Sequence, residues 1–159
     1  MRKRIIADAA PPDDRPAGAD WLDLATLAAV EVTSEDPAHP VEAAFRPDGT
    51  GWRATGPGAQ TLRLVFDAPT RVRRVRLTVR EAEVARTQEF VLRWSADGDR
   101  AYREVVRQQY TFSPPGTTAE VEDYRVDLDA VTALELRIVP DIGGGEAVAS
   151  VERMQVAAR

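Results

Sequence analysis

Apolar and polar residues alternate over several short stretches of this chain. In the stretch 61–66, every second residue is a large apolar one, namely Leu62, Leu64 and Phe66. Because successive side chains of a strand point to opposite faces, this alternation predicts strands with one buried and one polar face. The pattern recurs in further stretches, and three less regular runs bring the total to about eight expected strands: 74–80, 89–94, 124–128 and 134–138, then 30–34, 102–112 and 147–156.

Turn-forming sequences separate these stretches. They are Asp48-Gly49, Gly56-Pro57-Gly58, Ala68-Pro69, Asp97-Gly98, Pro114-Pro115-Gly116 and the three glycines 143–145. Short strands at this spacing predict an all-β fold, an antiparallel β-sandwich or jelly roll. The stretch Trp21–Ala28 is the one candidate helix, and its pattern fits a strand equally well. We expect a single domain over residues 20–159, preceded by a flexible tail over residues 1–19.

The composition narrows the cellular setting. Cysteine is absent from the 159 residues, which excludes disulfides and thiolate sites and suits a reducing compartment. The basic start Arg2–Arg4 resembles a secretory signal, but Asp8 interrupts the apolar run behind it, short of the roughly 7–15 residues that a signal needs. No apolar run approaches the roughly 18 residues of a membrane span. We therefore expect a cytoplasmic protein without membrane contact.

The charged residues exclude several function classes. A formal net charge of −5 argues against direct nucleic-acid binding, which normally requires a basic excess. The only histidine is His39, so a metal site built from several histidines is excluded, and no catalytic motif surrounds this residue. We expect a loop histidine without a chemical role and a protein that is not an enzyme.

A series of landmarks resembles a known family. The segment VEVTSEDPAHPVEAAFRPDGTGWRA (Val30–Ala54) is followed by the alternating TLRLVFDAPTRVRRVRLTV, then by FVLRWSADGDRAYREV, and near the end by ASVERMQV. This order resembles the discoidin or coagulation-factor C-type domain and, more broadly, the galactose-binding-like jelly roll. The first half is also similar to the N-terminal domain of the eukaryotic single-strand-break-repair scaffold.

The resemblance implies two uses for the turn before Trp52. In the resembling families this tryptophan mostly packs beneath the loop and closes one end of the sandwich; the alternative is an exposed ring that serves as a ligand platform. Arg53 is then a surface charge or a contact for an anion. The family often holds a structural calcium here, for which Asp48, Thr50 and Glu152 are the candidate ligands. The expected asparagine is missing, however, and the turn is shortened to DGTGW.

Two polar runs lie within otherwise regular strands and suggest a binding groove. Gln108 and Tyr110 share parity on one expected strand, so an amide and an aromatic ring would be presented together. That pair suits a sugar hydroxyl or an unstacked base. The full set of candidate groove residues is Arg86, Gln88, Arg107, Gln108 and Tyr110.

Arginines also occupy the polar side of several strands. If Val75, Leu77 and Val79 are buried, Arg74, Arg76 and Arg80 lie on the opposite face. They could bind an anionic partner or form a solvated face in which acidic residues of the same parity pair with arginine across strands. The candidate acidic partners are Glu89, Asp127 and Glu135.

The sequence supports two functional hypotheses. The first is a non-catalytic module that binds a carbohydrate or another polar small molecule. The second is an intracellular scaffold that recruits a protein partner, with a link to nucleic-acid repair. No cofactor is expected beyond the calcium considered above.

Overall fold

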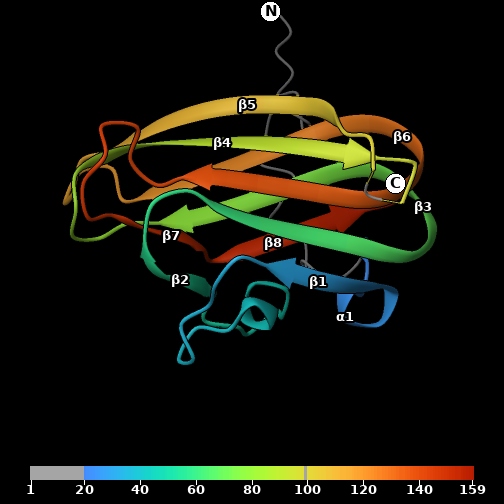
Figure 1. The fold of residues 1–159 in the computed structure, drawn as a ribbon, viewed down its shortest axis with the longest axis horizontal. Coiled ribbons are helices and arrows are strands. Elements are labelled where there is room, and N and C mark those ends of the chain that lie inside the picture. Colours follow the sequence, from blue (N-terminus) through green and yellow to red (C-terminus); the bar gives the residue numbers. More distant parts are fainter. Residues whose placement is uncertain (1–19, 99) are drawn as a thin grey trace, which may run out of the picture.

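The computed structural model describes residues 20–98 and 100–159, which form an antiparallel β-sandwich of eight strands (Figure 1). The strands are β1 (Ala28–Val32), β2 (Trp52–Pro57), β3 (Gln60–Arg80), β4 (Arg86–Ser95), β5 (Arg103–Phe112), β6 (Ala119–Val139), β7 (Val148–Val151) and β8 (Arg153–Ala157). A short helix α1 (Leu24–Leu27) precedes β1, and the 3-10 helix η3 (Val41–Ala44) lies between β1 and β2. The predicted all-β class is confirmed, whereas the expected tail lies outside the described residues.

Strands β3 and β6 each take part in both halves of the sandwich. Residues 60–65 of β3 pair with β1 on one side and with residues 133–138 of β6 on the other, while β4 and β5 extend this layer. Residues 74–80 of β3 pair with residues 119–125 of β6, and residues 74–78 also pair with β8. The two long strands thus carry the chain from one layer to the other.

The turn expected at Ala68-Pro69 is instead a bend within β3. The pairing of β3 with β6 shifts register between Val65 and Thr70 and again up to Arg74. Proline cannot donate a ladder hydrogen bond, and such irregularities allow a strand to bend without ending. The prediction of two separate strands was therefore wrong here, as it was for the stretches 124–128 and 134–138, which are joined in β6.

The core follows the predicted alternation. Leu62 and Leu64 from one half of β3, and Val75 and Leu77 from the other, are each about 1% exposed and belong to one hydrophobic cluster. Trp94, with the same parity as Phe90 and Leu92 on β4, packs against this cluster but stays partly exposed.

The segment before β3 differs from the sequence-based expectation. The stretch Trp21–Ala28 is divided between the four-residue α1 and the first residue of β1, so it forms neither a longer helix nor a full strand. Strand β2 begins at Trp52 and pairs with β7, although glycines and Pro57 had indicated only a turn. In Figure 1 this segment and α1 lie along the side of the sandwich opposite β5. Among the described residues, no helix has the length and apolar character to cross a membrane.

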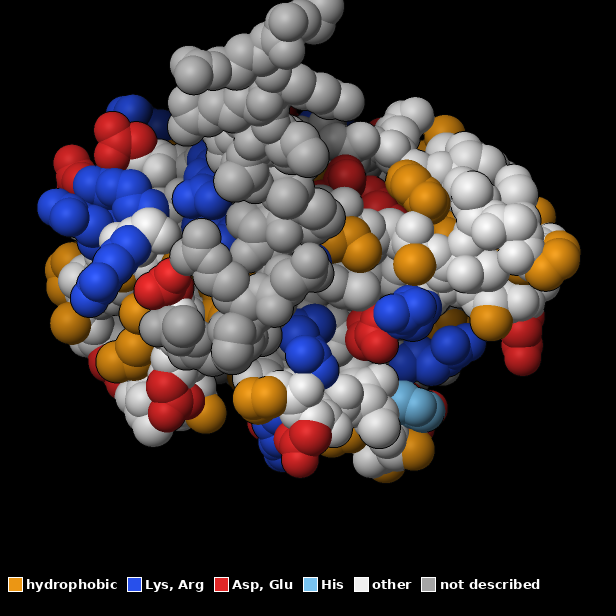
Figure 2. Space-filling view, turned by 180° about the vertical axis from the view of Figure 1, so that it is seen from behind, with side chains coloured by type: hydrophobic (Ala, Val, Ile, Leu, Met, Phe, Trp, Pro, Cys, Tyr) orange, Lys and Arg blue, Asp and Glu red, His pale blue; other side chains and the backbone are white. Residues whose placement is uncertain are grey.

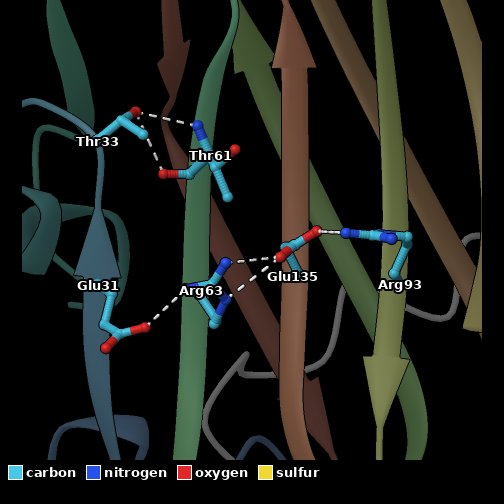
Figure 3. Close-up of polar contacts among 6 residues, drawn as sticks. All are labelled: Glu31, Thr33, Thr61, Arg63, Arg93 and Glu135. Carbon is cyan, nitrogen blue, oxygen red and sulfur yellow. Dashed lines mark hydrogen bonds and ion pairs between the residues drawn. The ribbon is translucent and has the colours of Figure 1, made fainter. Parts of the chain in front are cut away.

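Arginine and glutamate side chains cover the outer face of the first layer, as the parity argument predicted (Figure 3). Glu135, on β6, accepts hydrogen bonds from Arg63 on β3 at 2.8 Å and from Arg93 on β4 at 2.9 Å. Arg63 also donates to Glu31 of β1 at 2.9 Å, and Arg107 pairs with Glu89 at 2.6 Å. This face is a network of paired charges. Outside this layer, Asp127 pairs at 3.2 Å with Arg73, an arginine that the parity argument had not included.

Candidate functional site

Trp52 closes the sandwich beneath the loop that joins β1 to β2. Its side chain is 1% exposed, and its indole Nε1 donates a hydrogen bond to the backbone oxygen of Ser34 at 2.9 Å. A buried ring has no free face on which a sugar could stack. The structure thus supports the packing role implied by the family resemblance, and the alternative assignment of Trp52 as a ligand platform was wrong.

The loop above Trp52 is fixed by backbone hydrogen bonds to β2. The Arg53 amide donates to the His39 oxygen at 3.2 Å, and the Arg53 oxygen accepts from the Asp36 amide at 2.8 Å. Further along, Gly51 has φ +92°, and a Cβ at this position would lie 2.8 Å from the Cα of Glu152. Glycine is required here because the loop passes directly against the corner between β7 and β8.

These elements surround a small polar depression of about 190 Å³. We call it the Arg53 pocket, and it is lined by His39, Thr50, Trp52, Arg53, Arg80, Ser150, Val151 and Glu152. Its walls come from the loop before β2, from β2 itself, from the end of β3 and from the β7–β8 corner. Figure 2 shows the pale blue histidine beside basic and acidic side chains on this side of the molecule.

The charged groups of the Arg53 pocket are unequally paired. Arg80 Nε lies 2.5 Å from Glu152 Oε2, so these two groups form an ion pair. Arg53 is exposed, and its guanidinium forms no ion pair or hydrogen bond with a described residue. His39 Nδ1 lies 3.6 Å from Asp36 Oδ2. The hydrogen bond from the Ala38 amide, and to a smaller extent the interaction with His39, holds the pKa of Asp36 below its usual value. The pocket therefore offers an unpaired cation, an imidazole and hydroxyl groups.

The calcium hypothesis does not fit these side chains. Calcium requires about six to eight oxygen ligands, whereas the Glu152 carboxylate is already engaged by Arg80. Arg153 donates to the carbonyl oxygen of Pro47, next to Asp48, so a guanidinium contacts the loop that would supply further oxygens. Among the described residues, no group of three acidic or histidine side chains is arranged to hold a metal ion.

The predicted groove residues are divided between two faces of the sheet. Arg107 lies on the outer face, where it pairs with Glu89 and Glu104. Gln108 and Tyr110 lie on the opposite face, half-buried, and pair in register with Phe90 and Gln88. The predicted common parity of Gln108 and Tyr110 is confirmed, but the grouping with Arg107 was wrong because adjacent residues of a strand point apart.

Arg86 and Gln88 are interior residues that are almost completely shielded from solvent. Arg86 is 4% exposed and Gln88 is 0% exposed, so their assignment as ligand contacts was wrong for this conformation. Arg86 Nη1 donates to Gln88 Oε1 at 3.1 Å, and Gln88 Nε2 donates to Glu120 Oε1 at 3.0 Å. The guanidinium of Arg86 also contacts Glu81 at 2.8 Å and stacks 4.7 Å from the Phe112 ring centre. A charged side chain is buried here because carboxylate, amide and carbonyl partners surround it.

Glu120 was missed by sequence reasoning. It lies opposite Val79 on the inner side of β3 and β6, and it is 1% exposed. Burial, and then the nearby Glu122, raise its pKa to about 7. Its Oε2 atom has no hydrogen-bond partner among the described residues. The alternation of Val75, Leu77 and Val79 with polar residues predicted which face of β3 is buried. Only the pairing register of β3 with β6 shows that glutamates of β6 lie on the same buried face.

The Arg53 pocket likewise combines residues that the sequence had assigned to different roles. Arg53 was a ligand candidate, Thr50 and Glu152 were metal candidates, and Arg80 belonged to the arginine stripe. His39 was considered inert. They converge only because β2 pairs with β7 and β3 ends beside the β7–β8 corner. No local sequence signal indicates those pairings.

The family model of the F5/8 type C domain matches residues 29–154. This chain belongs to the F5/8 type C domain family. The match covers the sandwich from β1 into β8 and includes the whole of the Arg53 pocket, in agreement with the resemblance to coagulation-factor C-type domains. No curated protein is a significant match to the F5/8 type C domain described here.

Solved structures with the same fold include several carbohydrate-binding modules (CBMs). The family 32 CBM of Clostridium perfringens NanJ, solved with galactose, is 14% identical with a TM-score of 0.62, over 86% of this chain and 97% of that one. A second C. perfringens module, solved with GalNAc-β-1,3-galactose, is 16% identical with a TM-score of 0.65, over 87% and 99%. The module of AlyQ, solved with 4,5-unsaturated mannuronic acid, is 18% identical with a TM-score of 0.60, over 84% and 96%. At these identities, the likeness establishes a common fold.

Proposed function

We propose that this F5/8 type C domain is a non-catalytic carbohydrate-binding module and that its ligand occupies the Arg53 pocket. The observation that carries the proposal is the guanidinium of Arg53, which has no ion-pair partner among residues 20–98 and 100–159, beside His39, Ser150 and Glu152 in one depression. Sugar hydroxyls both donate and accept hydrogen bonds, and the pocket supplies both kinds of partner. The structural neighbours solved with sugars support the same ligand class.

The floor and walls of the pocket suit binding without large rearrangement. Trp52 is held from below by its hydrogen bond to Ser34, and the backbone of Arg53 is tied on both sides to the β1–β2 loop. A site that is already ordered loses little conformational entropy when a ligand binds. Sugars are weakly held by each single hydrogen bond, so this preorganisation contributes directly to affinity.

The side chains of the pocket do not form a glycosidase arrangement. Hydrolysis of a glycosidic bond commonly requires two carboxyl groups on opposite sides of the bond. Of the described residues that line the Arg53 pocket, Glu152 alone carries a carboxylate, and it accepts a hydrogen bond from Arg80. Recognition is the chemistry that these groups support. The alternative of a repair-linked scaffold is not favoured by any feature of the described residues, and it stays a prediction.

An NMR titration tests the proposal. Galactose and GalNAc-β-1,3-galactose are added to the isotope-labelled domain, and we expect the largest amide shifts at Arg53, Ser150 and Glu152. Arg53→Ala should weaken binding roughly tenfold, as the loss of a hydrogen bond from a charged group does. Arg107→Ala, which alters an exposed arginine on the outer sheet face, should leave affinity unchanged. Shifts centred on Gln108 and Tyr110 instead would move the site from the Arg53 pocket to β5.

A further inference from the structure

We propose that the Arg53 pocket selects saccharides that carry a carboxylate, such as uronic acids, over their neutral counterparts. This inference rests on the proposed function, since it concerns the ligand class of the same pocket. It follows from the imbalance between positive and negative groups that face the depression.

The pocket has a positive excess although the chain is acidic overall. Two guanidinium groups, Arg53 and Arg80, line it together with one carboxylate, Glu152. Arg80 and Glu152 pair with each other, so no carboxylate of the described residues is in ion-pair contact with Arg53. The chain as a whole has a net charge of −5, so this excess is a local feature of the pocket.

Several arginines of the first layer are paired with glutamates. Arg63 and Arg93 share Glu135, and Arg107 has both Glu89 and Glu104. Among the described residues, Arg53 has no carboxylate within ion-pair distance, although its charge helps to lower the pKa of Asp36. Asp36 Oδ1 accepts from the Ala38 amide at 3.0 Å, and Asp36 Oδ2 lies 3.6 Å from His39 Nδ1.

The position of Arg53 is suited to a carboxylate ligand. Its backbone is fixed by hydrogen bonds to His39 and Asp36, so the base of the side chain is held at the edge of the pocket. A guanidinium presents two parallel N–H donors that match the two oxygens of a carboxylate. The His39 imidazole borders the same depression and adds a further donor, which carries a positive charge when it is protonated.

Two sugars that differ at one carbon provide the test. Methyl α-D-galactopyranoside has a CH₂OH group at C6, where methyl α-D-galacturonopyranoside has a carboxylate. Affinities for both are measured by NMR titration with the unmodified domain, with Arg53→Gln and with Arg137→Gln. Arg137 is an exposed arginine on the outer sheet face, so the third protein carries the same charge change away from the pocket.

We expect the unmodified domain to bind the galacturonoside roughly tenfold more tightly than the galactoside, as a charge-assisted bidentate contact would give. Arg53→Gln should reduce this ratio to about one, and Arg137→Gln should preserve it. Equal affinities in the unmodified domain would overturn the carboxylate preference while leaving the proposed function intact. A preference retained in Arg53→Gln would also overturn it. Binding of neither sugar at this pocket would remove the proposed function and this inference together.

Discussion

Trp52 and Ser34 are joined by a hydrogen bond of 2.9 Å from the indole Nε1 to the backbone oxygen, across 18 residues of chain. The ring that seals the sandwich thereby also anchors the loop that carries His39. Packing and pocket geometry consequently depend on the same side chain, and changes to it should affect stability first and binding second.

Trp52→Ala should lower the free energy of unfolding by about 3–5 kcal/mol, because it removes a large buried side chain. Trp52→Phe keeps an aromatic ring and loses the indole donor, so we expect a smaller loss of about 1–2 kcal/mol. Chemical denaturation of both variants measures these values. A near-neutral Trp52→Ala would mean that the ring is not part of the core.

The buried carboxyl of Glu120 should make stability depend on pH. Its pKa in the folded protein is raised from 4.5 to about 7 by burial and then by Glu122. A raised acid pKa means that the folded state retains the proton, so the unfolded state is favoured as pH rises. The penalty is absent below pH 4.5, grows between 4.5 and 7, and reaches roughly 3 kcal/mol above this window.

Glu120→Gln should remove most of this dependence and make the protein more stable at pH 8, because the amide does not ionise. Unfolding free energies of the unmodified protein and the variant, measured from pH 5 to pH 8, provide the comparison. Glu122→Gln is the matched control. It removes a neighbouring negative charge, so it should lower the pKa of Glu120 and reduce the loss of stability at high pH without abolishing it. Parallel profiles for Glu120→Gln and the unmodified protein would contradict the assignment.

The alternation of side chains predicted the fold class and much of the core, because a period of two directly reflects which face of a strand is buried. It located Leu62 and Val75 inside and Arg63 outside. It could not show that Ala68-Pro69 bends β3 without ending it, since proline is compatible with both a turn and an irregular strand.

The candidate sites were predicted less well than the fold. Glu120 is an ordinary surface residue by type, and its burial follows from pairing with Val79 of β3, 41 positions earlier in the sequence. Arg53 and Glu152 meet only through the pairing of β2 with β7. Register between distant strands is set by the packing of the whole sandwich, which no local pattern encodes.

Glu135 should contribute more to stability than the other glutamate of its network. Its side chain is 5% exposed and accepts hydrogen bonds from Arg63 and Arg93, whereas that of Glu31 is 55% exposed. Burial raises the pKa of Glu135, but the hydrogen bonds from Arg93 and Arg63 outweigh it and hold the pKa below 4.5. Its contribution is therefore present above pH 4.5 and lost as pH falls further.

Glu135→Gln should cost about 1–2 kcal/mol at pH 7, less than for a fully buried pair because both arginines remain partly exposed to solvent. Glu31→Gln, the exposed counterpart, should cost about 0–1 kcal/mol. Denaturation at pH 7 distinguishes the two. Equal costs would show that the shared position of Glu135 between two arginines adds nothing.

A comparison of two glycines with positive φ distinguishes the cost of backbone strain from the cost of steric contact. Gly51 has φ +92° and Gly58 has φ +95°, but an added Cβ at Gly51 meets Glu152 Cα at 2.8 Å, whereas at Gly58 it meets nothing within 4 Å. Gly58→Ala should cost about 1–2 kcal/mol from conformation alone. Gly51→Ala should cost roughly 1–3 kcal/mol more, because the β7–β8 corner has to move. Denaturation curves of similar midpoint for both variants would contradict this contact.

Calcium should leave the stability of this domain unchanged. Arg80 pairs with Glu152, and Arg153 donates to the Pro47 oxygen, so guanidinium groups already engage oxygens that a cation at this loop would need. Thermal unfolding in millimolar calcium chloride, in EDTA and in magnesium chloride at equal ionic strength measures the effect. A site occupied at about 100 times its dissociation constant would add about 2.7 kcal/mol, and the midpoint would rise by several degrees. A rise of that size in calcium alone, reversed by EDTA, would show that the loop rearranges to displace Arg80 from Glu152 and binds the ion after all.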